Sequence, residues 1–228
     1  MGWAELILAM TLFLATHFLP AQGPVRARLV RALGAPTYFA LYGTISTLTL
    51  VWILAAAARA PHVELLAPAP WQRWGANLAM PAAFLCLGLG LGFRYPYTLF
   101  GRRRSTFDPD EPGLAAITRH PALWALAIWA AAHALANPDL AHLIAFGLFL
   151  VISVAAFGLF DRRARAAEPA RWPGIQDATA LLSLRPLGQA GWLRRNRKGL
   201  LVRILLGLAL YAAMLGLHPW LIGVSPLP

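Results

Sequence analysis

Six histidines, and few other reactive groups, give this chain its capacity for chemistry. Neutral imidazole is a common metal ligand and exchanges protons near neutral pH. The sequence has no HExxH pair and no GxSxG element, and its single cysteine, Cys86, excludes an intramolecular disulfide or a thiolate cluster. We therefore do not expect a zinc protease, a serine hydrolase or a cysteine-ligated metal centre.

Long apolar stretches must position these histidines. The 228 residues are 59% hydrophobic and 13% charged, more apolar than a soluble domain of this length can bury. Six stretches approach the roughly 20 residues that a membrane-spanning helix needs. They are residues 3–20, 37–58, 75–93, 121–136, 140–160 and 200–224. The sequence predicts an all-α polytopic membrane bundle of about six transmembrane helices, in a single domain over residues 1–228.

Positive charge alternates between the loops of this bundle. Of the 20 Lys and Arg residues, 18 lie in or beside loops 21–36, 94–120 and 161–199. Because Lys and Arg are retained on the cytoplasmic side during insertion, these loops are expected to be cytoplasmic and both termini periplasmic. A formal net charge of +11 is also typical of proteins that bind nucleic acids. Since the basic residues flank apolar runs and lack interleaved aromatics, we expect attraction to anionic membrane lipid and no nucleic-acid partner.

Smaller features refine this picture. Residues 137–139 are expected to form a tight outer turn between the fourth and fifth spans, and residues 175–187 a short helix at the inner interface. Gly88, Gly90 and Gly92 give the third span a face of small residues that permits close helix packing.

The predicted topology sorts the histidines by depth. His17 closes the first span and His120 opens the fourth, both at the inner side. Two histidines at one depth on different helices can ligate a haem iron, although histidines near helix ends also cap carbonyls or face headgroups. His133 lies roughly 20 Å along the helix axis from His120, so these two cannot share one iron. His133 and Asn137, four residues apart, are weaker candidates that we expect to hydrogen-bond locally.

A resemblance to a known family adds to this reading. The core signature of the NnrU family resembles the run Ile117-Thr118-Arg119-His120-Pro121, followed by Trp124, Trp129, Ala132-His133 and Asn137-Pro138-Asp139. The resemblance extends to His17 after Leu12-Phe13-Leu14 and to the ending His218-Pro219-Trp220, so it spans nearly the whole chain. It implies a bacterial inner-membrane protein associated with nitrite and nitric oxide reduction in denitrification, with denitrification reductases as partners.

The same family includes the plastid 15-cis-zeta-carotene isomerase, Z-ISO, which uses a haem b ligated by two histidines. Carried over by position, this resemblance implies haem b as cofactor, with His17 and His120 as axial ligands. Arg119 or the basic run 102–104 would pair with the haem propionates.

Three alternatives stay open at this point. One is a haem-dependent cis–trans isomerase acting on a carotenoid or another hydrophobic polyene, as in Z-ISO. Another is an S-adenosylmethionine-dependent membrane methyltransferase, because Arg119-His120-Pro121 is also similar to the isoprenylcysteine carboxyl methyltransferases. Those enzymes carry a Glu-Glu pair that the comparable stretch 161–168 lacks. The third is a non-catalytic assembly factor for a nitric oxide reducing system.

Overall fold

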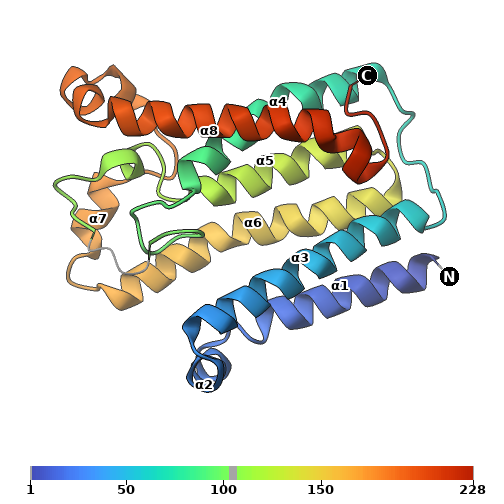
Figure 1. Ribbon diagram of the computed structural model, residues 1–228, viewed down its shortest axis with the longest axis horizontal. Helices are drawn as coiled ribbons and strands as arrows, with labels where there is room; N and C mark the ends of the chain where they lie inside the picture. The colour runs from blue at the N-terminus through green and yellow to red at the C-terminus, as the bar shows by residue number, and fades with distance from the viewer. Residues whose placement is uncertain (1, 103–106, 228) are drawn as a thin grey trace. The chain divides into compact units, whose positions relative to one another are not determined.

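The structure, a computed structural model, describes residues 2–102 and 107–227, and most of these residues are helical (Figure 1). Within these residues two isolated β-bridges occur and no strand, which confirms the all-α prediction. The α-helices are α1 (Gly2–Phe18), α2 (Gly23–Leu33), α3 (Ala35–Arg59), α4 (Pro70–Gly90), α5 (Pro121–Ala136), α6 (Leu140–Ala167), α7 (Trp172–Ala178) and α8 (Ala190–Ile222). Two short 3-10 helices, η1 (Gly113–Ala116) and η2 (Arg185–Gly188), complete the set.

Membrane-helix character is clear from length and composition. Among the described residues α3, α6 and α8 are long and apolar enough to cross a membrane, and α1 with α2 would be a fourth, broken span with a 78° bend. Each of the six predicted stretches contains a helix: α1, α3, α4, α5, α6 and α8. The structure therefore supports a helical membrane protein with three or four candidate spans.

The residues fall into two compact units, and the first comprises residues 1–67 and 137–147. In this unit α1 lies beside α3 (Figure 1). The hydroxyls of Tyr38 and Tyr42 on α3 donate to the carbonyls of Pro20 and His17, which fixes the C-terminal end of α1 against α3. The three arginines of α2 and its lack of buried residues are typical of a helix at a membrane interface.

The second unit comprises residues 68–136 and 148–228, and in it α4 packs against both α5 and α8. Small residues allow this, as predicted. A Cβ on Gly88 of α4 would lie 2.9 Å from the Cα of Gly207 on α8, and one on Gly90 would lie 3.1 Å from the Cβ of Ala122 on α5. Gly92 instead follows α4 with a φ of +61°, in the left-handed region that glycine adopts without strain.

A half-buried arginine closes the C-terminal end of α4. The guanidinium of Arg203 on α8 donates to the carbonyls of Leu89, at 2.8 Å, and Gly92, at 3.2 Å. The last carbonyls of a helix have no partner within it, and a cation there also complements the helix dipole. Arg203 therefore joins α8 to α4 from within an otherwise apolar segment.

The predicted interfacial helix over residues 175–187 is wrong in extent. Helix α7 ends at Ala178, and η2 begins only at Arg185. Between them, backbone hydrogen bonds join residues 180–183 to residues 115–119. These non-local bonds satisfy the backbone groups that a continuous helix would have paired locally.

Candidate functional site

The loop that precedes α5 is held from the side by a distant segment. The amide of Arg119 donates to the carbonyl of Ala180 at 2.8 Å, and the amide of Ser183 donates to the carbonyl of Ile117 at 2.8 Å. Pro121 then begins α5, where its fixed φ suits the first helical position. His120 is thereby fixed at the junction between a short loop and a helix.

His120 is completely buried and both of its ring nitrogens are engaged. Its Nε2 lies 2.8 Å from Oδ1 of Asp161, and its Nδ1 lies 2.9 Å from the hydroxyl of Thr98. Arg119 forms a bidentate ion pair with the same carboxylate, at 2.8 Å from Nε and 2.6 Å from an Nη nitrogen. We call Thr98, Arg119, His120 and Asp161 the His120 cluster.

The hydrogen bonds define the protonation of this cluster. An ionised carboxylate only accepts hydrogen bonds, so Nε2 of His120 carries the proton that it donates to Asp161. Burial lowers the pKa of His120, which lies just before α5, and so favours the neutral imidazole. In that state Nδ1 is an acceptor, and the hydroxyl of Thr98 donates to it. The charges of Arg119 and Asp161 cancel, so the cluster is neutral overall.

Aromatic side chains enclose the cluster. The rings of Phe157, Phe160 and Tyr95 lie with their centroids about 6 Å from that of His120. Tyr95 is 1% exposed, and its hydroxyl has no hydrogen-bond partner among the described residues. Leaving a buried hydroxyl unpaired is costly, so a bound water or a small polar ligand would be stabilised there.

The other predicted ligand, His17, lies in the first unit near the C-terminal end of α1. Its Nδ1 is 3.1 Å from the hydroxyl of Ser46 on α3. Its ring stacks on Phe13 at 5.0 Å and tilts against Tyr42 at 5.3 Å. A histidine whose Nδ1 is held by a second group has a fixed ring orientation and presents its Nε2, as metal-binding histidines commonly do.

The two histidines differ in how well they fit a haem iron. His17 has no hydrogen-bond partner at Nε2 among the described residues, so it fits an axial ligand. His120 does not fit as it is placed, because Asp161 engages its less hindered Nε2 and Thr98 engages Nδ1. The described residues also contain no group of three or more His, Cys, Asp or Glu that could hold a metal ion.

The residues predicted to pair with the haem propionates are Arg119 and the run 102–104. Within the described residues, both side-chain hydrogen bonds of Arg119 go to Asp161. In this arrangement Arg119 binds a carboxylate of the protein and not a haem propionate. Of the run 102–104, residues 103 and 104 lie outside the described residues.

The weaker candidates have local roles. The ring Nδ1 of His133 donates to the carbonyl of Trp129, one turn earlier on α5, at 2.8 Å. Asn137 follows the end of α5 at Ala136, so it does not continue that helix face. His142 hydrogen-bonds to Asp139 at the start of α6. His218 donates to the carbonyl of Val224.

Sequence reasoning missed the partners of His120. Asp161 is the first residue of the predicted loop 161–199 and comes directly after the apolar stretch 140–160. That position, a single carboxylate at the end of a span, is the signal that could have identified it. No sequence pattern identified Thr98 or Tyr95, because their role depends on how the loop after α4 folds back over His120.

Comparison with known proteins places the chain. The family model described as NnrU protein matches residues 5–226. This chain belongs to the NnrU family. The NnrU match includes His17 and the whole His120 cluster and runs through both units. No curated protein matches the chain, and no solved structure matches it.

Proposed function

We propose that this NnrU-family chain serves nitrite and nitric oxide metabolism in the bacterial cytoplasmic membrane, and that the His120 cluster is its functional centre. One observation carries the proposal: a fully buried histidine faces a carboxylate that an adjacent arginine clamps. Ionisable groups held inside an apolar bundle are costly and commonly mark function. The competing explanation is that the cluster only anchors the loop before α5 to α6.

The cluster is suited to proton transfer. Arg119 keeps Asp161 ionised, Asp161 holds the proton on Nε2 of His120, and Nδ1 is left as a base covered by the hydroxyl of Thr98. A polar substrate that displaced this hydroxyl would meet that base, with the hydroxyl of Tyr95 as a further donor nearby. Because nitrite reduction consumes protons, a buried acid–base group fits this metabolism.

The test is complementation of a strain that lacks the gene. We expect His120→Gln and Asp161→Asn to abolish the chain's effect on nitrite consumption and nitric oxide accumulation during anaerobic growth. His62→Gln, a change at an exposed position in an outer loop by our topology, is the matched control and should complement fully. Immunoblots of membrane fractions must show equal amounts of each variant. Full complementation by His120→Gln at equal abundance would refute the proposal.

We also propose that all six long helices cross the membrane and that both termini are periplasmic. The charge distribution supports this, because the arginine-rich segments adjoin one end of each long helix. Alkaline phosphatase is active only in the periplasm, so fusions after residues 67 and 227 should be active and fusions after residues 33 and 112 inactive. An active fusion after residue 33 or an inactive fusion after residue 227 would contradict the topology.

Haem b binding is a second proposal, and His17 favours it. His17 would hold the iron through Nε2 while Ser46 orients the ring. When bound, haem b supplies an iron centre for electron transfer or for binding a small ligand. An absorption spectrum with a pyridine haemochrome assay tests it: His17→Ala should lose the haem, whereas His120→Ala should keep it, because Asp161 and Thr98 engage both ring nitrogens of His120. A colourless wild-type protein from haem-replete cells would exclude this proposal.

Assays on the same purified protein distinguish the remaining alternatives. Conversion of a cis-polyene by the haem-loaded chain would favour an isomerase, and binding of labelled S-adenosylmethionine would favour a methyltransferase. Against methyl transfer, the two acids of segment 161–168 are already engaged, Asp161 as above and Glu168 by Tyr97 and Arg171. If the chain is an assembly factor, we expect the purified protein to convert no substrate and deletion of its gene to lower reductase activity.

A further inference from the structure

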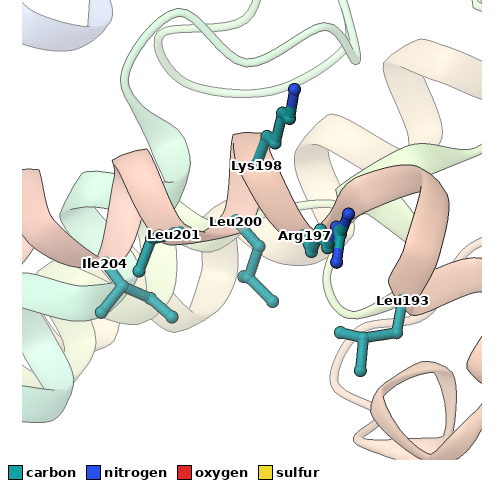
Figure 2. A pocket seen from close by; sticks show the side chains of 6 residues that line it. All are labelled: Leu193, Arg197, Lys198, Leu200, Leu201 and Ile204. Carbon is teal, nitrogen blue, oxygen red and sulfur yellow. The ribbon is translucent and has the colours of Figure 1, made fainter.

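A groove runs along the cytoplasmic end of α8 by our topology, outside the His120 cluster. It has a volume of about 520 Å³ and is lined by Leu193, Arg197, Lys198, Leu200, Leu201 and Ile204. Figure 2 shows Leu193, Leu200 and Ile204 pointing to the same side of the helix, with Arg197 between the first two of them. One cation is thus set into an apolar strip.

The groove lies where α8 changes from basic to apolar. Residues 194–198 contain four basic side chains, and the rest of the helix contains only Arg203. Its apolar lining is open, since Leu193 is 38% exposed and Leu201 is 56% exposed. In a helix that crosses the membrane, such a transition falls at the level of the lipid headgroups.

Within residues 2–102 and 107–227, the cations of the groove, Arg197 and Lys198, form no ion pair with the protein. The lining contains no acidic residue, so its electrostatic potential is positive. A ligand that complements this surface carries an anionic group joined to an apolar chain.

We propose that this groove binds one phospholipid with an anionic headgroup from the cytoplasmic leaflet. Its phosphate lies at Arg197, with Lys198 at the flank, and an acyl chain follows Leu200, Leu201 and Ile204. A phosphate group offers two oxygens that accept paired hydrogen bonds from a guanidinium. An apolar surface of a partner protein has no such acceptors. The site does not depend on the proposed role in nitrite metabolism.

Native mass spectrometry of the purified chain, titrated with phosphatidylglycerol or with phosphatidylcholine, tests this. We expect one phosphatidylglycerol to be retained and to be preferred over the zwitterionic lipid. One basic residue near anionic lipid is worth roughly fivefold in affinity, so Arg197→Gln should weaken retention about fivefold. Arg195→Gln removes the same charge from the opposite side of the helix, since successive residues turn by about 100°, and should change little. Arg197→Lys keeps the charge but loses the paired hydrogen bonds, so it should weaken retention less than Arg197→Gln does.

Three results would overturn the proposal. Equal retention of phosphatidylglycerol and phosphatidylcholine would show that the headgroup charge is not recognised. Equal losses in Arg197→Gln and Arg195→Gln would show a diffuse charge effect and no built site. A dimer that Arg197→Gln dissociates would show that a second copy of the chain occupies the groove.

Discussion

Replacing Asp161 by Asn is the change that most directly tests the account of the His120 cluster. The substitution keeps the size of the side chain and removes its charge. Arg119, whose side chain is 8% exposed, then retains a buried positive charge without its partner, and His120 loses a charged acceptor. Removing one partner of a buried ion pair typically costs 3–5 kcal/mol.

The magnitude here falls at the lower end of that range. Water reaches part of the pair, because the side chain of Asp161 is 21% exposed. We therefore expect a loss of about 3 kcal/mol in the free energy of unfolding. For a chain of this length that corresponds to a fall in Tm of about 6–12 °C. Arg119→Met combined with Asp161→Asn should lose less than the sum of the two single changes, because the double variant leaves no unpaired charge.

The single thiol of the chain provides the assay. Cys86 lies half-buried on α4, in the same unit as the cluster, so a maleimide dye reports its exposure as the detergent-solubilised protein unfolds on heating. Glu5→Gln is the control, since it breaks the ion pair with Arg59 in which the side chains are 31% and 55% exposed. Exposed pairs contribute little to stability. If Asp161→Asn lowers Tm no more than Glu5→Gln does, the cluster is not the buried electrostatic unit described here.

Three further predictions use the same protein. Thr98→Val should lower the free energy of unfolding by about 1–3 kcal/mol in the dye assay, because Nδ1 of the buried His120 loses its donor, whereas Thr47→Val at an exposed position should not. Gly207→Ala should cost about 1–3 kcal/mol, since its Cβ would lie 2.6 Å from the carbonyl oxygen of Phe84 on α4, while Gly216→Ala meets nothing within 4 Å and serves as control. Burial and the hydrogen bond to Glu168 raise the pKa of Tyr97, in the loop after α4, from 10.0 to about 12. The stabilisation from protonated Tyr97 should be complete below pH 10 and lost as the pH rises through about 12, and an ultraviolet titration of wild type against Tyr97→Phe should show one late-titrating phenol.

The sequence by itself determined the class of the protein and most of its helices. Apolar runs of 16 to 25 residues can be solvated only by lipid or by one another, so their helical state is decided locally. The arrangement of arginines gives an orientation for the same reason, because insertion reads charge along the chain. The run around His120, together with His17 and the ending His218-Pro219-Trp220, also indicated the NnrU family, which the match over residues 5–226 confirmed.

Only the tertiary structure decided what His120 does. Their depth along the helices predicts that His17 and His120 act together, but depth does not define which atoms a side chain contacts. Residues 180–183 bind the backbone before α5, the loop after α4 brings Thr98 to Nδ1, and Asp161 on α6 takes Nε2. These contacts join residues 22 to 66 positions apart in the chain, and no local periodicity encodes them. The imidazole binds these partners because a buried polar group is stable only when it is hydrogen-bonded, and packing of the whole unit determines which partners are within reach.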